Sequence, residues 1–215
     1  MISRETLINK VREALELGGN RKFVQGVDLQ IIFKGLDPKS QEARFRDAVY
    51  LPKGLGKKNK ICVVADGDMA IKAREGGADL LITREELQNI DKKKAKKIAS
   101  ECDWILVKAD LMGLVGRVLG PALGPRGKAP IPVPVNADII SQINYYRSVT
   151  RLRNKEQPFV SCRVGSEKMK PEDLADNILA ILNYVENKIK QPLEQVVDYI
   201  IIKTTMGAPV RVYLR

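Results

Sequence analysis

The feature that most constrains the fold is a change of pattern near residue 61. From there to about residue 152, short apolar segments at 61–65, 79–83 and 104–109 alternate with segments of helical character. Short strands that alternate with helices are typical of βαβ units, which form a parallel sheet. We therefore predict a compact αβ domain over residues 61–152.

The flanking segments, 1–60 and 153–215, follow a different pattern. Apolar and polar side chains alternate near Val27, as expected for a strand with one buried face. Apolar residues three or four apart between Leu174 and Val185 predict an amphipathic helix. We predict that the two segments join in one split α+β domain. The predicted fold class is therefore α/β with two domains, the first discontinuous in sequence.

The charge balance favours a polyanionic partner. Lys and Arg number 37 against 26 Asp and Glu, which gives a formal net charge of +11. Such a surface attracts nucleic acid, because each cation that neutralises a phosphate releases a counterion. Charge that serves only solubility is the alternative. The predicted outer segments, 1–60 and 153–215, carry eight of the eleven surplus charges, so the main phosphate-binding face is expected there.

The residue content argues against catalysis and against a bound metal or cofactor. The chain has no histidine, which removes Ser-His and Cys-His catalysis and the usual zinc sites. Its three cysteines, Cys62, Cys102 and Cys162, are far apart and predict reduced core thiols in a cytosolic protein. No segment has the length of a transmembrane span or the pattern of a signal peptide, so no membrane partner is expected.

A Gly/Pro-rich stretch at residues 116–128 does not match nucleotide-binding motifs. The P-loop pattern requires glycine at position 122 and Ser or Thr at position 129, and both positions hold alanine. We predict a stiff, exposed loop over residues 120–134, in which Arg126 and Lys128 could make a secondary RNA contact. A structural crossover is an equally good interpretation.

Residues Lys203 to Gly207 form the most unusual short segment. Two hydroxyl groups and a lysine at a strand end precede a Met-Gly bend. Such groups can recognise the 2′-hydroxyls, phosphates and unstacked bases of RNA. An ordinary hairpin would have the same pattern, and the chemistry alone does not separate the two.

Three strings of residues resemble the archaeal form of the ribosomal protein L-one family. They are Leu51-Pro52-Lys53-Gly54-Leu55-Gly56-Lys57, Gly120-Pro121-Ala122-Leu123-Gly124-Pro125-Arg126-Gly127-Lys128 and Lys203-Thr204-Thr205-Met206-Gly207, in family order and at family spacing. The resemblance covers nearly the whole chain. It implies that the split domain makes the principal rRNA contact and that the inserted domain, residues 61–152, is Rossmann-like.

The resemblance also implies the residues that contact RNA. They are Lys22, Phe23, Ser166, Lys168, Thr204, Thr205, Met206 and Gly207. The chain departs from the archaeal pattern at Val24, Gly26 and Tyr199, where relatives usually carry a threonine, a residue with a side chain and, in many members, a serine.

The implied function is that of a non-catalytic structural protein of the large ribosomal subunit. It would bind the rRNA of the mobile side stalk, move with deacylated tRNA leaving the ribosome, and repress translation by binding its own mRNA. Away from the ribosome it would be a cytoplasmic monomer without cofactors. Two rivals remain: a small-molecule enzyme built on the inserted domain, and an RNA chaperone whose binding follows net charge alone.

Overall fold

The chain forms two compact units in the computed structural model. The structure describes residues 2–37, 40, 44–154 and 156–214. Residues 1–57 and 148–215 form one unit, here termed the outer unit, and residues 58–147 form the inserted unit. Each unit mixes helices with a sheet, which confirms the predicted α/β fold class.

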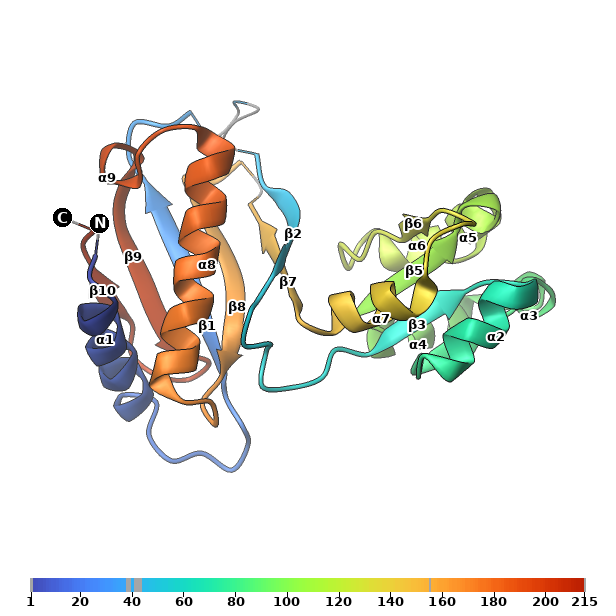
Figure 1. The fold of residues 1–215 in the computed structure, drawn as a ribbon, viewed down its shortest axis with the longest axis horizontal. Coiled ribbons are helices and arrows are strands. Elements are labelled where there is room, and N and C mark those ends of the chain that lie inside the picture. The colour runs from blue at the N-terminus through green and yellow to red at the C-terminus, as the bar shows by residue number, and fades with distance from the viewer. Residues whose placement is uncertain (1, 38–39, 41–43, 155, 215) are drawn as a thin grey trace. The chain divides into compact units, whose positions relative to one another are not determined.

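The outer unit is built on a six-stranded antiparallel sheet in the order β10-β9-β1-β8-β7-β2. Its strands are β1 (Gly26–Phe33), β2 (Arg46–Tyr50), β7 (Val149–Arg153), β8 (Phe159–Ser166), β9 (Val197–Thr204) and β10 (Val210–Val212). Its helices are α1 (Arg4–Glu16), α8 (Pro171–Ile189) and the short α9 (Leu193–Val196). Helices α1 and α8 lie side by side on one face of the sheet (Figure 1).

Alternation along β1 shows which face of this sheet is buried. Val27, Leu29 and Ile31 are fully buried in one core with side chains of α1 and α8. Asp28 and Gln30 lie between them on the opposite face and are partly exposed. Because successive side chains of a strand point to opposite faces, the polar groups of β1 lie away from the helices.

The inserted unit has a four-stranded parallel sheet in the order β4-β3-β5-β6. The strands are β3 (Ile61–Val64), β4 (Leu80–Ile82), β5 (Trp104–Lys108) and β6 (Ile131–Val133). The helices are α2 (Gly67–Glu75), α3 (Arg84–Gln88), α4 (Lys92–Glu101), the 3-10 turn η1 (Ala109–Leu111), α5 (Met112–Val118), α6 (Gly120–Leu123) and α7 (Ile139–Arg147). The parallel sheet predicted from the alternating pattern is therefore present.

Three details of the sequence-based description differ from the structure. Residues 149–152 were assigned to the inserted domain, whereas strand β7 pairs with β2 in the outer sheet. The predicted loop at 120–134 contains helix α6 and strand β6, which are too short to give a periodic pattern. The helical segment between the apolar segments 79–83 and 104–109 is two helices, because Asp91 caps a second helix by accepting from the Lys94 N–H at 2.8 Å.

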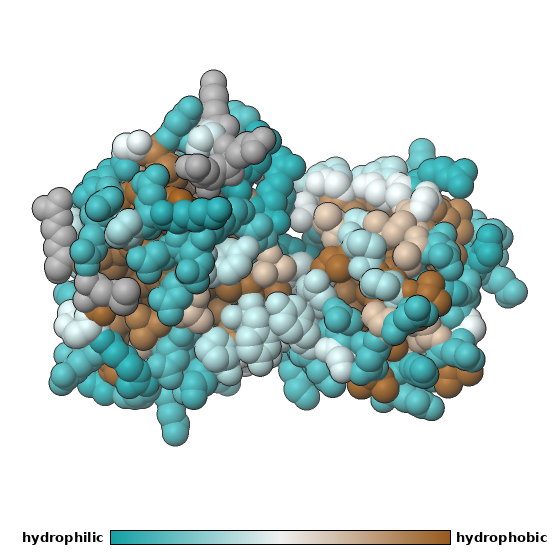
Figure 2. Space-filling view, turned by 45° about the horizontal axis from the view of Figure 1, so that its top comes forward, coloured by the Kyte–Doolittle hydropathy of each residue, from teal (hydrophilic) through white to brown (hydrophobic). Residues whose placement is uncertain are grey.

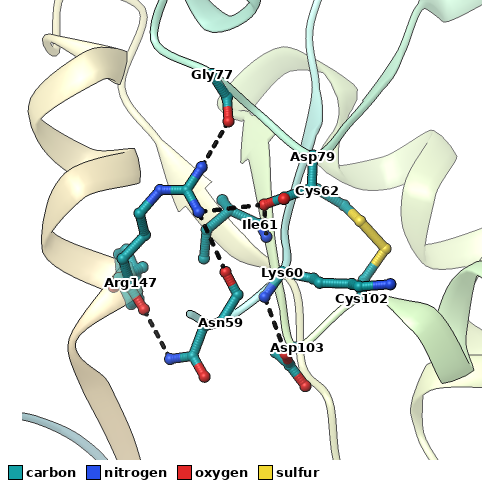
Figure 3. Close-up of polar contacts among 10 residues, drawn as sticks. Asn59, Lys60, Ile61, Cys62, Gly77, Asp79, Cys102, Asp103 and Arg147 are labelled. Carbon is teal, nitrogen blue, oxygen red and sulfur yellow. Dashed lines mark hydrogen bonds and ion pairs between the residues drawn. A yellow bond between two sulfur atoms is a disulfide. The ribbon is translucent and has the colours of Figure 1, made fainter. Parts of the chain in front are cut away.

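The prediction for the cysteines was wrong for two of the three. Cys62 of β3 and Cys102, just before β5, form a disulfide with a Cα–Cα distance of 5.8 Å (Figure 3). The two residues are 40 positions apart in sequence, but β3 and β5 are adjacent parallel strands, which brings them together. Cys162 is a buried free cysteine, and burial raises the pKa of its thiol.

Polar contacts fasten the two segments at which the inserted unit begins and ends. The Arg147 guanidinium donates to the carbonyl of Gly77 at 2.6 Å and lies 3.5 Å from the Asp79 carboxylate (Figure 3). The Asn59 amide donates to the carbonyl of Tyr146 at 3.0 Å. Both ends of the inserted unit are thereby tied to its own fold.

The surface is mainly hydrophilic on the face shown in Figure 2, with apolar side chains gathered in small patches between polar ones. Within the described part of the chain, no helix combines the length and the apolar character that crossing a bilayer requires.

Candidate nucleic-acid interface

Three segments that are distant in sequence meet at one end of the outer sheet. The start of β1 lies between the end of β8 and the end of β9, because Gly26 pairs with Ser166 and Val27 pairs with Thr204 (Figure 1). The predicted residues of all three segments are therefore neighbours. Lys22 and Phe23 precede β1. Ser166 ends β8 and Lys168 follows it, whereas Thr204 ends β9 and Thr205 to Gly207 follow it.

The segment after β9 is a tight bend fixed to β1 by its backbone. The Thr205 N–H donates to the carbonyl of Gly26 at 3.0 Å, and the Gly26 N–H donates back to the Thr205 hydroxyl at 3.1 Å. The Gly207 N–H donates to the carbonyl of Thr204 at 3.2 Å. Thr205 and Met206 are exposed, and Met206 has 59% of its surface accessible. The bend thus presents a hydroxyl and a thioether to solvent on a fixed backbone.

A buried glutamine braces this bend from beneath. Gln25 is fully buried, and its side-chain oxygen accepts from the Met206 N–H at 2.9 Å. Its amide nitrogen donates to the Glu167 carboxylate at 3.0 Å and to the carbonyl of Gly18 at 3.2 Å. The backbone N–H of Gln25 also donates to Glu167, at 2.9 Å. Gln25 therefore joins the end of α1, the turn after β8 and the bend after β9.

Sequence reasoning missed both Gln25 and Glu167, although one signal was available. Gln25 continues the alternation of Val27 and Leu29 by one step, which places it on the buried face of the strand. A buried polar side chain is almost always hydrogen-bonded. That combination marks Gln25 as a residue with fixed partners.

Two predicted residues lie beneath the surface. Thr204 is fully buried and Ser166 is 1% exposed, and their hydroxyl oxygens have no hydrogen-bond partner among the described residues. A Cβ at Gly207 would come within 2.3 Å of the Thr204 hydroxyl oxygen, and one at Gly18 within 2.8 Å. Thr204 is packed between two glycines and shapes the bend. A direct RNA contact by Thr204 or Ser166 stays a prediction.

The segment that leads into β1 adds exposed apolar surface. Phe23 has 51% of its surface accessible and Val24 has 46%, and Lys22 beside them is exposed. Exposed aromatic side chains are platforms on which unpaired bases can stack. Gln25 holds the backbone of Met206, and Phe23 lies two residues before Gln25, so both exposed side chains are close in the chain to this contact.

A groove of about 550 Å³ opens beside the bend. It is lined by Val24, Gly26, Asp28, Gly56, Lys57, Arg163, Ser166, Lys168 and Thr205. Three of the predicted residues, Ser166, Lys168 and Thr205, meet in its wall. Sequence reasoning missed Asp28 and Arg163, whereas Lys57 ends the first of the three family strings and lies among the residues, 21–60, whose cations were expected to contact phosphates. The side chains of the groove carry three positive charges and one negative charge, so the groove suits an anionic group.

The carboxylate of Asp28 is the one acidic group in this lining. Burial raises its pKa, and the positive charges of Arg163 and Lys203 oppose that increase. The net shift is upward, so the two cations only partly compensate the loss of water around the carboxylate.

The model of the family described as "Ribosomal protein L1p/L10e family" matches residues 11–208. This chain belongs to that family. The protein named "Large ribosomal subunit protein uL1" from Staphylothermus marinus is 51% identical over 98% of this chain and 97% of its own length. Proteins of the same name from Hyperthermus butylicus and Archaeoglobus fulgidus are 50% and 42% identical, and the matches cover at least 99% of each chain. The resemblance recognised from the three sequence strings is confirmed.

In this member of the L1p/L10e family, the two cations predicted in the inserted unit differ in their surroundings. Arg126 is exposed, and it donates to the carbonyl of Ala122 at 3.1 Å. Lys128 is partly buried, and its ammonium donates to the carbonyls of Ala99 at 3.0 Å and Cys102 at 2.5 Å. Lys128 therefore caps the end of α4, where a cation is favoured. The RNA contact of both residues stays a prediction.

The departures from the archaeal pattern of the family have distinct surroundings. Val24 and Gly26 line the groove, so both lie at the candidate interface. Tyr199 lies on β9, five residues before the end of the strand. Its ring packs against Tyr213 at a centroid distance of 5.9 Å, and the Arg211 guanidinium lies 5.2 Å from its centroid. Tyr199 is thereby held by side-chain contacts with Tyr213 and Arg211.

Proposed function

We propose that this chain is a structural protein of the large ribosomal subunit that binds the rRNA of the mobile side stalk through its outer unit. One observation carries the proposal: three distant segments converge on a braced bend that is bordered by a cationic groove. The relatives named "Large ribosomal subunit protein uL1" support rRNA as the partner. This function requires binding and no catalysis.

Each exposed group at the interface has a matching RNA chemistry. Phe23 and Met206 offer apolar surface for unstacked bases, and the Thr205 hydroxyl can exchange hydrogen bonds with a 2′-hydroxyl or a base edge. Lys22 and Lys168 are exposed cations that would neutralise phosphates. The fixed backbone lowers the cost of ordering the bend upon binding, which favours a specific contact.

Two further roles belong to the same proposal. On the ribosome, the protein would move with the side stalk as deacylated tRNA leaves, and Arg126 and Lys128 of the inserted unit would make the secondary RNA contact. Away from it, the cytoplasmic monomer would bind a similar structure in its own mRNA and repress translation. Both roles are what the resemblance to the family implies.

A comparison of two RNAs tests the proposal. One carries the side-stalk fold, the other is a scrambled RNA of equal length, and the affinity of the protein for each is measured at two salt concentrations. We expect a preference of roughly several hundredfold that persists at the higher salt. Thr205→Ala should reduce it by about tenfold or more, the usual effect of losing a specific contact. Thr6→Ala, at an exposed threonine of α1, is the control and should change nothing. Equal binding of both RNAs, lost steeply with salt, would identify a charge-driven RNA chaperone instead.

A further inference from the structure

Arg163 is one of the three cations of the groove, and no specific RNA contact has been assigned to it so far. It lies on β8 directly opposite Asp28 of β1. Oppositely charged residues at such cross-strand positions commonly pair. In the described part of the chain, however, no ion pair joins Arg163 to Asp28. An ion pair with Asp28 therefore does not explain why an arginine lies at position 163.

The guanidinium of Arg163 instead turns toward the bend. Its Nε donates to the carbonyl of Gly165 at 2.9 Å, which orients the planar group. Its two terminal amino groups find no acceptor among the described residues. Arginine presents these groups as a rigid fork that matches two oxygens of a phosphate. One edge of the fork is held and the other is open to a ligand.

Gly26 makes room for this placement. A Cβ at Gly26 would lie 3.2 Å from Arg163 Nε and 3.4 Å from Cζ, closer than an ordinary contact. The same point lies 3.6 Å from the hydroxyl oxygen of Thr205. A side chain at position 26 would therefore require the guanidinium to shift by a few tenths of an ångström, whereas glycine leaves it next to Thr205.

We propose that the groove holds a backbone phosphate of the bound RNA, gripped by the Arg163 guanidinium, with Lys57 and Lys168 completing a cationic wall. Arg163 thereby supplies a phosphate contact next to Thr205. The inference rests on the proposed RNA-binding function and adds a specific phosphate site to it.

The salt dependence of RNA affinity separates a phosphate contact from other roles. For each phosphate neutralised, the slope of log K against log salt changes by about 0.7 to 0.9. Arg163→Gln should make the slope shallower by that amount and weaken binding of the side-stalk RNA by roughly ten- to a hundredfold at low salt. Arg163→Lys keeps the charge and should keep the slope, but it should bind less tightly because the fork is lost.

Arg12→Gln is the matched control. Arg12 lies on α1, which packs on the opposite face of the sheet from Arg163, and its guanidinium pairs with Glu172 on the surface. It should change neither slope nor affinity. The unfolding free energies of all three variants show whether any loss reflects the fold, and Arg163→Lys keeps the test decisive if Arg163→Gln is unstable.

Two outcomes overturn different statements. If wild-type protein prefers the side-stalk RNA but Arg163→Gln behaves like Arg12→Gln, the phosphate site is wrong and the proposed function stands. If wild-type protein does not distinguish the side-stalk RNA from the scrambled one, the proposed function itself fails.

Discussion

Replacing Gln25 by alanine tests whether the brace beneath the bend controls RNA binding. The side chain is fully buried and makes hydrogen bonds to the Met206 N–H, to the carbonyl of Gly18 and to the Glu167 carboxylate. Truncation removes all three at once. The truncation also leaves the Met206 N–H, the Gly18 carbonyl and the Glu167 carboxylate without this hydrogen-bond partner until water enters.

The expected loss of stability follows from the kinds of bond. Each of the two bonds to backbone groups contributes about 1 kcal/mol, and the bond to the charged carboxylate of Glu167 about 2 kcal/mol. The unfolding free energy should therefore decrease by about 3–4 kcal/mol, and by less where water replaces the amide. RNA must then order the freed bend, and fixing each released residue costs about 1–2 kcal/mol. Affinity should decrease by roughly tenfold or more.

Urea unfolding and RNA binding measured on the same preparations give both quantities. Gln30→Ala is the control, because Gln30 lies on β1, which Gln25 directly precedes, on the face away from the helices, and is only half-buried. It should cost under about 0.5 kcal/mol, as most surface substitutions do. The brace would be refuted if folded Gln25→Ala bound the side-stalk RNA as tightly as Gln30→Ala.

Two other predictions concern the disulfide and the half-buried carboxylate of Asp28. Cys62→Ala with Cys102→Ala should destabilise the inserted unit by about 4 kcal/mol, since the crosslink closes a loop with a sequence separation of 40. Thermal unfolding with and without reductant checks this, and Cys162→Ala should leave the sensitivity to reductant intact. Asp28 has a raised pKa when folded, so its contribution to stability is present below the unfolded pKa of about 4 and is lost as pH rises through the folded pKa. Urea unfolding of Asp28→Asn over this range should show less loss of stability with rising pH, and parallel curves for the two proteins would contradict it.

The fold was largely predictable because its signals are local or periodic. Short apolar segments between helices identified the parallel sheet, and alternation near Val27 identified β1. The errors arose where an element is too short for a period, as in β6 with Pro132 at its centre. The Cys62–Cys102 bond was missed because it depends on which strands are adjacent, and spacing in sequence does not contain that information.

The candidate interface was predictable only in part, for a related reason. The bend at Thr205 to Gly207 is continuous in sequence, so a short string could identify it. The groove is assembled from four segments, and Arg163 is one arginine among many until the sheet places it beside Gly26. Gln25 has no charge and belongs to no motif. Its importance follows from burial and from partners more than a hundred positions away.

The brace and the cationic wall should contribute to RNA binding in physically different ways. Hydrogen bonds and packing at the Met206 bend act at contact distance, so losing Gln25 should weaken binding by a similar factor at every salt concentration. Losing the charge of Arg163 should change the slope with salt, because a counterion is no longer released. A variant with both changes should therefore show the shallower slope of Arg163→Gln, and its affinity at each salt concentration should be lower than that of Arg163→Gln by the factor found for Gln25→Ala. A slope that also changes in Gln25→Ala would mean that the bend positions the phosphate-binding cations as well, and that the two parts of the interface form one coupled unit.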